Sequence, residues 1–334
     1  MCFFLFRTIL NTVYKITKKY NLKRLRKCEV FMPMIRHLGL KAYGKINLGL
    51  DVLKKREDGY HEVRMIMQTV GLYDKIDLYL KETPGITVQT NLYYLPVNEN
   101  NLVYKAAKLL MDEFHINHGV TIHLKKFIPV SAGMAGGSSD AAAVLFGVNK
   151  MFNLGLSMEA LMERGVKIGA DVPYCVMRGT ALSEGIGEIL TPLPPIPQCQ
   201  VLIAKPGISV STKFVYEHLD AASLRPSDHP DIDGMIAAIR KRDIYGAASL
   251  LGNVLETVTI PEYPVIAEIK DRLKSLGAVN ALMSGSGPTV FGIFTSPKAA
   301  EEAYEEMRYG KSANLAKSVY LTNFYNTKEV SHGK

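Results

Sequence analysis

The sequence has no tryptophan, only four cysteines, and no apolar run of the length that crosses a bilayer. A membrane-spanning helix needs roughly 18 or more consecutive apolar residues, so we expect no integral membrane protein. The cysteines form no CxxC pair and no cluster with histidine; they are Cys2, Cys28, Cys175 and Cys199. This pattern argues against a disulfide scaffold and a zinc site, and it is typical of proteins of the reducing cytoplasm.

The chain also has almost no excess of positive over negative charge once the first 33 residues are set aside. The net charge of the 334 residues is +8, but residues 1–33 hold eight basic side chains and one acidic one, which leaves +1 for residues 34–334. The body of the chain therefore gives no reason to expect nucleic acid or a membrane as partner. Its 47% apolar and 22% charged content predicts a globular protein with one large domain or two ordinary ones. The oligomeric state is not predictable from these features.

Residues 1–33 do not have the order of a secretory signal. The apolar start Met1–Phe6 precedes the basic cluster Lys15–Lys27, no A-x-A cleavage site follows, and the stretch has no serine or alanine. Three interpretations stay open: a basic arm on anionic lipid, a tail that contacts RNA, and upstream sequence translated from a misassigned start. Because Met32 and Met34 lie just before the first strand pattern, we favour a misassigned start or a disordered extension.

Hydrophobic periodicity predicts an α+β chain with domains at residues 34–190 and 199–328. The first domain has strand patterns at 38–44, 45–53, 62–70, 75–81, 86–90 and 120–124, and helical patterns at 102–114 and about 158–167. The second has strand patterns at 201–204, 279–283, 289–294 and 318–321, three helical stretches between 211 and 276, and a helix from 297. This second order is compatible with a split βαβ sandwich. Residues 191–198 carry four prolines and are the predicted linker.

The strongest local signal is PVSAGMAGGSS at residues 129–139, between a strand pattern and an Ala-rich helical pattern. Small side chains let the backbone approach a ligand, and a helix N-terminus offers unpaired N–H groups, so this segment can cradle phosphate. It lacks the Gly-Lys-Ser/Thr of a Walker loop, and Ser131 replaces the first glycine of a dinucleotide fingerprint. The alternative is a tight strand-to-helix turn capped by Ser139 or Asp140.

At this loop the sequence resembles the GHMP kinases. AYGKINLGLDV (42–52), DGYHEV (58–63), GADVPYC (169–175), SEGIGEILTPL (183–193) and SGSGPTVF (284–291) follow in the order of one member, whose acceptor is a cytidine diphosphate-linked methylerythritol. The resemblance covers about residues 36–325. It implies the two-domain GHMP kinase fold: an N-terminal α/β nucleotide-loop domain and a C-terminal split βαβ (ferredoxin-like) domain. The sequence departs from some relatives at Ser131, Ala132 and Ala135, where they have glycine.

The resemblance implies an ATP- and Mg²⁺-dependent kinase that phosphorylates the 2-hydroxyl of that small-molecule acceptor. Mg²⁺ would be held mainly by ATP, with Ser138 as a candidate ligand. Lys126 and Asn101 fall where relatives contact the adenosine. The ATP loop would comprise Pro129, Val130, Ser131, Ala132, Gly133, Met134, Ala135, Gly136, Gly137, Ser138 and Ser139.

The resemblance assigns catalysis to Asp171 and Lys45. Asp171 would accept the proton of the acceptor hydroxyl, and Lys45 would reach this hydroxyl and hold the carboxylate ionised. Asn47, two residues further on the same side of the strand, would bind substrate or Asp171. Taken singly, the three could equally be a turn residue before proline, a solvated lysine and a polar residue of a solvated strand face.

For the acceptor, the turn signal Asp58-Gly59 would present Tyr60 and His61 at the start of a strand. The resemblance implies that Tyr60 stacks on cytosine while His61 reads its edge; taken alone, the pair could be a core tyrosine beside a surface histidine. Tyr216 would be the second aromatic residue of the slot. Thr212, on the same helical face, would contact the diphosphate. The SGSG turn at 284–287 would close over the phosphates or form only a hairpin.

Two rival functions remain. Another GHMP kinase would act on a mevalonate- or homoserine-like acceptor, which carries no base, so the Tyr60–His61 pair argues against it. A protein that binds nucleic acid or a membrane surface through residues 1–33 would be the other, and the near-neutral body argues against it. We therefore expect a small-molecule substrate, no nucleic acid and no membrane as partners.

Overall fold

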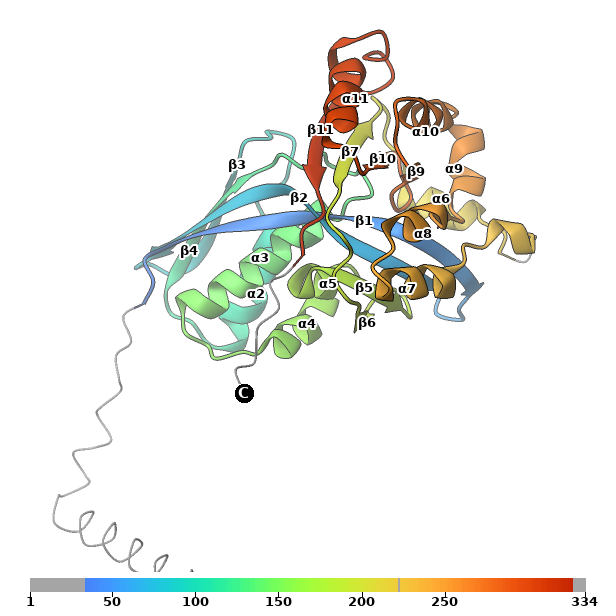
Figure 1. Ribbon diagram of the computed structural model, residues 1–334. Helices are drawn as coiled ribbons and strands as arrows, with labels where there is room; N and C mark the ends of the chain where they lie inside the picture. The colour runs from blue at the N-terminus through green and yellow to red at the C-terminus, as the bar shows by residue number, and fades with distance from the viewer. Residues whose placement is uncertain (1–33, 222, 327–334) are drawn as a thin grey trace, which may run out of the picture. The chain divides into compact units, whose positions relative to one another are not determined.

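The computed structural model describes residues 34–221 and 223–326 (Figure 1). Our expectation for residues 1–33 lies outside these residues. The elements below lie between residues 35 and 326, where a seven-stranded and a four-stranded sheet are combined with helices.

Two long antiparallel strands, β1 (His37–Lys55) and β2 (His61–Lys81), carry the seven-stranded sheet. Its order is β3–β4–β2–β1–β8, and β5 extends it from β2 to β6. The sequence predicted two shorter strands in place of each long one. The structure keeps β1 continuous because register shifts at Tyr43/Lys45, Asn47/Gly49 and Val52/Lys54 absorb its irregular pattern. The other strands are β3 (Gly85–Thr90), β4 (Gly119–Lys125), β5 (Thr180–Glu184), β6 (Ile189–Pro192) and β8 (Gly252–Asn253).

Helices of the N-terminal part pack beside this sheet (Figure 1). They are α2 (Leu102–Glu113), α3 (Gly136–Met151), α4 (Met158–Val166) and α5 (Val172–Met177). α3 lies against α2, α5 and β1, and its alanines, Ala141 to Ala143, are buried there because small side chains permit a close approach. Asn101 is the N-cap of α2: its Oδ1 accepts the N–H of Val103 at 3.1 Å.

The C-terminal part forms an antiparallel sheet in the order β11–β7–β10–β9. If the four strands are numbered in chain order, their order across the sheet is 4-1-3-2. This is the strand order of a split βαβ (ferredoxin-like) sheet, so the predicted arrangement is confirmed. Its strands are β7 (Gln200–Lys205), β9 (Asn280–Met283), β10 (Val290–Phe294) and β11 (Ser318–Asn323), and α11 (Pro297–Tyr309) connects the last two.

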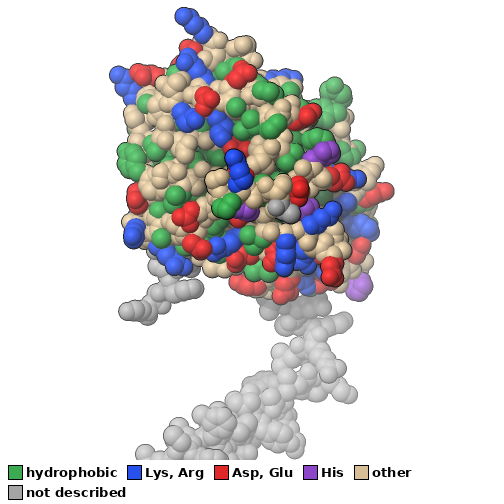
Figure 2. Space-filling view, turned by 90° about the vertical axis from the view of Figure 1, so that its right-hand side faces the viewer, with side chains coloured by type: hydrophobic (Ala, Val, Ile, Leu, Met, Phe, Trp, Pro, Cys, Tyr) green, Lys and Arg blue, Asp and Glu red, His purple; other side chains and the backbone are tan. Residues whose placement is uncertain are grey.

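The connection from β7 to β9 is more divided than the sequence predicted. In place of three helical stretches the structure has α6 (Thr212–His218), η2 (Pro226–Asp228), α7 (Ile232–Arg240), α8 (Ile244–Ser249), α9 (Glu256–Glu262) and α10 (Val265–Ser275). Arg242, with a left-handed φ of 58°, separates α7 from α8, and Pro264 separates α9 from α10. On the face that these helices present in Figure 2, basic and acidic side chains are interspersed.

The two sheets are joined through shared packing. β8 pairs in parallel with β1, and Val70 pairs with Phe324. One buried cluster combines Ile46 and Ile66 of the first sheet with Ile203 and Phe291 of the second. The predicted linker has no regular structure from 193 to 199, and its Ile196 is buried. In the described part of the chain, no helix is both long and apolar enough to cross a membrane.

Candidate active site

A cavity of about 1210 Å³ collects most of the predicted site residues. Its wall contains Lys45 and Asp171, the loop residues Pro129 to Gly133 and Ala135 to Ser138, and Asn101, Lys126, Tyr60, His61, Thr212 and Tyr216. Three predicted residues do not line it. Met134 packs in the core, the Ser139 hydroxyl donates to the Tyr43 carbonyl oxygen at 2.6 Å, and Asn47 is fully buried.

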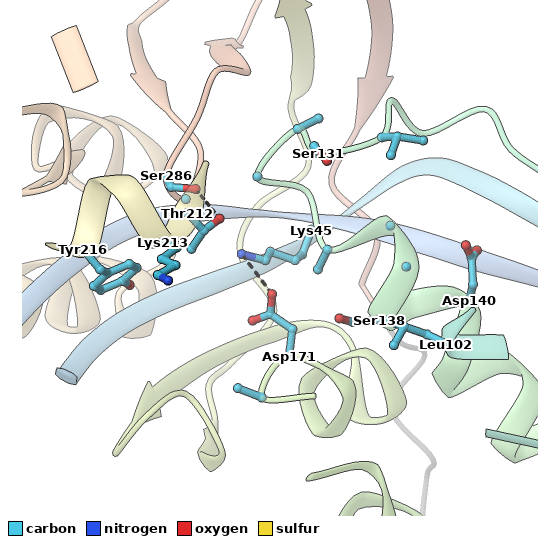
Figure 3. Close-up of a pocket in the computed structure, with 18 of the residues that line it drawn as sticks. Lys45, Leu102, Ser131, Ser138, Asp140, Asp171, Thr212, Lys213, Tyr216 and Ser286 are labelled. Carbon is cyan, nitrogen blue, oxygen red and sulfur yellow. Dashed lines mark hydrogen bonds and ion pairs between the residues drawn. The ribbon is translucent and has the colours of Figure 1, made fainter. Parts of the chain in front are cut away.

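Lys45 and Asp171 face each other across the floor of the cavity (Figure 3). Lys45 Nζ lies 3.8 Å from Asp171 Oδ2 and donates a hydrogen bond of 2.8 Å to Asn47 Oδ1. Lys45 is buried, whereas the Asp171 side chain is one-third exposed, so the carboxylate is open to a ligand and the ammonium is held behind it. Asp171 is the N-cap residue of α5, five residues beyond the end of α4.

The bulges of β1 explain how this pair is held. Because register shifts occur on both sides of Lys45–Asn47, these side chains are aimed differently from those of a regular strand. Asn47 then contacts Lys45, and its Nδ2 lies 3.4 Å from Met65 Sδ; its predicted contact with Asp171 is therefore made through the lysine. An ammonium fixed beside a half-open carboxylate can orient a hydroxyl and receive its proton.

The loop at residues 129–137 has an unusual backbone. Ser131, Gly133 and Ala135 all have left-handed φ angles, of 51°, 70° and 51°. Such a conformation costs a non-glycine residue roughly 1–2 kcal/mol. Ser131 and Ala135 are two of the positions where some relatives have glycine. A serine or alanine there therefore carries a conformational cost, but its small side chain leaves space for a ligand. Alternating left-handed residues turn successive N–H groups toward one side, which suits an anion.

A buried network of charges closes the base of this loop. Asp74 Oδ1 accepts the N–H groups of Phe127 and Ile128 at 2.5 and 2.8 Å, just before the loop. Lys126 Nζ donates to Asp74 Oδ2 at 2.5 Å and to Asp140 Oδ2, near the N-terminal end of α3, at 2.6 Å. The two ends of the loop are thus tied to each other through one lysine.

The electrostatics of this network follow from its burial. Burial raises the pKa of Asp140 well above its usual range, although Lys126 acts against this. Burial also lowers the pKa of Lys126, but the two carboxylates outweigh it, so the pKa of this lysine lies above its ordinary value. The ammonium predicted to contact adenosine is therefore engaged by two carboxylates, although it lines the cavity.

Sequence reasoning missed Asp74, and it considered Asp140 only as one possible cap in the alternative interpretation of the loop. Neither Ser139 nor Asp140 caps α3: the N-cap position belongs to Ala135, and no side chain bonds there. Asp74 lies between the strand patterns predicted at 62–70 and 75–81, and the sequence assigned it no role. Only the pairing of β1, β2 and β4 shows that it points into the core beneath the loop.

The SGSG turn contacts the loop at residues 129–137 directly. Ser284 Oγ donates to the Gly133 carbonyl oxygen at 2.9 Å, and Thr212 Oγ1 shares a hydrogen bond of 2.8 Å with Ser286 Oγ. Asn253 Nδ2 supports the turn from behind by donating to the carbonyl oxygens of Met283 and Gly285. The C-terminal part of the chain therefore supplies one wall of the cavity and holds the loop in place.

Replacing Gly133 with alanine should disturb both the loop and the turn. A Cβ there would lie 2.0 Å from the Ser284 carbonyl oxygen, in addition to the cost of φ = 70°. Gly155→Ala is the matched control, because Gly155 has φ = 72° and open space around a Cβ. We expect the control to lose about 1 kcal/mol of unfolding free energy and Gly133→Ala clearly more, with a KM for ATP raised at least about tenfold. Equal losses in both variants, with unchanged ATP kinetics, would contradict this contact.

Aromatic residues gather at the other end of the cavity. The rings of His61 and Tyr216 lie 5.2 Å apart, while Tyr60 is 60% exposed. Burial, with a smaller effect of Lys55, lowers the pKa of His61, so its ring is neutral at pH 7 and can both donate and accept. Burial, followed by the negative charge of Asp171, raises the pKa of Tyr216. Thr212 lies one helical turn before Tyr216 and faces the same cavity.

Comparison with known proteins identifies the family. The model of the GHMP kinases N terminal domain matches residues 101–179, and that of the GHMP kinases C terminal domain matches residues 235–312. A 4-diphosphocytidyl-2-C-methyl-D-erythritol kinase of Lachnoclostridium phytofermentans is 59% identical over 88% of this chain and 99% of its own. The chain belongs to the GHMP kinases. A kinase of the same name from Lachnospira eligens is 56% identical over 86% of this GHMP kinase and 98% of its own chain.

Solved structures agree with this assignment. A crystal structure of 4-(cytidine 5'-diphospho)-2C-methyl-D-erythritol kinase has a TM-score of 0.71 and 30% identity, covering 87% of this GHMP kinase and all of that chain. The mevalonate kinase of L. major, with a TM-score of 0.72 but 16% identity over 88% of this chain and 98% of its own, shares the fold. The predicted family and α+β fold class are confirmed.

Proposed function

We propose that this GHMP kinase transfers the γ-phosphoryl group of ATP to the 2-hydroxyl of 4-diphosphocytidyl-2-C-methyl-D-erythritol. The products would be the 2-phosphate and ADP, in the methylerythritol phosphate route to isopentenyl diphosphate. The observation that carries the proposal is a single cavity with the aromatic residues Tyr60, His61 and Tyr216 at one end. The Lys45–Asp171 pair lies between Tyr216 and the 129–137 loop (Figure 3). The relatives at 59% and 56% identity bear the name of this activity.

The residues support a division of work along the cavity. Tyr216 and Tyr60 would hold the cytosine ring, with the neutral His61 at its edge. Asp171 would accept the hydroxyl proton while Lys45, kept in place by Asn47, orients the hydroxyl. The N–H groups of the 129–137 loop would bind the phosphates of ATP. Phosphoryl transfer needs mainly positioning and charge neutralisation, which these groups provide.

The donor set at the loop suits Mg²⁺ bound mainly through ATP. Among residues 34–221 and 223–326, no group of three His, Cys, Asp or Glu side chains is placed to hold a metal ion. The Ser138 side chain lines the cavity in the first turn of α3 (Figure 3). Mg²⁺ commonly takes one or two protein oxygens together with substrate phosphates and water. When bound, it would neutralise charge on the phosphates.

We place this activity in the cytoplasm, with small molecules as its partners. Cys175 and Cys199 are free and buried, as suits a reducing compartment. Burial raises the pKa of Cys199 to about 12, so this thiol stays protonated and unreactive. No role for nucleic acid or a membrane is needed.

Acceptor choice is the direct test of the proposed function. ADP release should be measured with the cytidine-linked acceptor, mevalonate and homoserine side by side, each with ATP and Mg²⁺. We expect turnover with the first acceptor alone. The rival acceptors carry no base, and the aromatic end of the cavity would have no ligand. Turnover with mevalonate or homoserine, and none with the cytidine-linked acceptor, would transfer the assignment to another GHMP kinase.

Removing an aromatic side chain should weaken acceptor binding without affecting ATP. Stacking on a base contributes roughly 1–3 kcal/mol, so Tyr216→Ala should raise the KM of the acceptor about 5- to 150-fold. Tyr60→Ala should have a smaller effect because Tyr60 is more exposed. Tyr245→Ala, at a site 59% exposed and outside the cavity, is the control and should change neither KM. A rise in the KM of ATP would mean that the slot binds the other ligand.

A further inference from the structure

One face of α6 lines the cavity beyond the residues considered so far. Thr212, Lys213, Tyr216 and Glu217 all contribute to the wall, and their spacing places them on the same side of the helix. Figure 3 shows Lys213 next to Thr212 and Tyr216, at the rim of the space that holds Lys45 and Asp171. The sequence singled out Thr212 and Tyr216 but not the lysine between them.

The positive charges of the cavity wall are mostly engaged already. Of the residues that the structure describes, four lysines and no arginine line it: Lys45, Lys55, Lys126 and Lys213. Lys45 is held by Asn47 and Asp171, and Lys126 by Asp74 and Asp140. Lys55, which pairs across the strands with His61, lies at the aromatic end. Lys213 is thus the lysine whose charge is available to an anion between the aromatic residues and the Lys45–Asp171 pair.

The contact that Lys213 makes does not occupy its charge. Its Nζ lies 3.8 Å from Glu217 Oε1, one helical turn away, and the two side chains are 82% and 58% exposed. Ion pairs of this kind contribute little because water screens them and both side chains lose freedom. An anion that enters the cavity can replace this carboxylate at small cost.

We propose that Lys213 binds the diphosphate of the acceptor and thereby determines specificity for a diphosphate-linked substrate. This rests on the proposed function. An acceptor with its base at His61–Tyr216 and its hydroxyl at Lys45–Asp171 must pass its diphosphate along the intervening wall. That wall carries Lys213 and the hydrogen-bonded pair Thr212–Ser286, one charge and two hydroxyls suited to phosphate oxygens.

Steady-state kinetics of Lys213→Met test the proposal on the full chain. Losing a charge-assisted contact should raise the KM of the cytidine-linked acceptor about 10- to 100-fold, with kcat and the KM of ATP unchanged. Lys213→Arg keeps the charge and should recover most of the affinity. The acceptor KM of the wild type should increase with salt, and less so for Lys213→Met, because exposed charges are screened.

Lys298→Met is the matched control. Lys298 forms the same type of exposed i,i+4 pair, 3.7 Å from Glu302 on α11, and does not line the cavity. It should behave as the wild type. If Lys213→Met also does, or if it raises the KM of ATP instead, the assignment is wrong. A large effect of Lys55→Met on the acceptor together with none of Lys213→Met would assign the diphosphate to Lys55 and overturn the proposal.

Calorimetric binding of two fragments of the acceptor, cytidine 5'-diphosphate and cytidine, separates this inference from the proposed function. Cytidine 5'-diphosphate should bind the wild type more tightly than cytidine, and Lys213→Met should reduce this ratio about tenfold or more while leaving cytidine unaffected. A wild type that binds neither probe and does not phosphorylate the acceptor would overturn the proposed function. An unchanged ratio in an active Lys213→Met enzyme would overturn only the role of the lysine.

Discussion

Replacing Asp171 with asparagine should lower turnover by about two to four orders of magnitude while the protein folds normally. The amide keeps the shape of the side chain at the start of α5, but it can neither accept a proton nor attract Lys45 as a charge. Since the side chain is open to the cavity and makes no buried hydrogen bond to the chain, both KM values should change little. Single-turnover measurements with saturating substrates would show whether the loss lies in the chemical step.

The control for this variant is Asp112→Asn. Asp112 also pairs with a lysine, Lys108 at 2.7 Å, but on the surface of α2 and outside the cavity. The turnover of Asp112→Asn should remain within about twofold of the wild type, because exposed ion pairs contribute little. Near wild-type turnover of Asp171→Asn at saturating substrate would remove Asp171 from the mechanism.

Replacing Lys126 with methionine should cost about 3–5 kcal/mol of unfolding free energy at neutral pH. The variant leaves Asp74 and Asp140 buried without their counter-charge. The loss should depend on pH, because the pKa of Asp140 is raised in the folded state. Such a carboxyl stabilises the fold fully at a pH below its unfolded pKa, and this stabilisation is lost as the pH rises through its folded pKa. Without Lys126 this raised pKa moves higher still. The difference in unfolding free energy between Lys126→Met and the wild type should therefore be smaller at pH 5 than at pH 8.

Urea unfolding at both pH values measures this effect, with Lys108→Met as control. Lys108 pairs with the exposed Asp112, so its removal should leave the free energy of unfolding almost unchanged at either pH. A loss for Lys126→Met that is the same at pH 5 and pH 8 would show that the two carboxylates do not titrate against folding. A KM for ATP that stays normal would show that the network is not required to shape the loop.

The parts of the fold that follow from local pattern were predictable. Alternation located the cores of the strands, and the helical pattern at 102–114 located α2. What failed depended on contacts between distant residues. β1 and β2 run on as single strands because bulges absorb the irregular positions, and α5 has only six residues, too few for a helical period to show. The helices between Ser211 and Leu276 are short, so their breaks at Arg242 and Pro264 were hidden within longer apolar patterns.

The candidate site shows the same division. Lys45, Asp171 and the 129–139 loop could be found because each carries a motif that resembles a known family. Lys126 was noted, but its partners were not, since Asp74 is 52 residues away in sequence and Asp140 is 14. Lys213 carried no signal, because an exposed lysine in a short helix resembles any surface residue. Charge networks and cavity walls arise from tertiary structure, which local periodicity does not encode.

The hydrogen bond from Ser284 to Gly133 makes the two halves of the chain dependent on each other. A fragment ending near residue 190 would contain every residue of the 129–139 loop, yet it would lack the turn that holds the centre of this loop and the Asn253 that supports the turn. The missing half could not be replaced by an unrelated partner domain, because β8 also pairs with β1 from within it. The shape of the loop at which we propose phosphate binding is thus a property of the joined halves, and we expect an insertion in the 284–287 turn to change the KM of ATP as well as that of the acceptor.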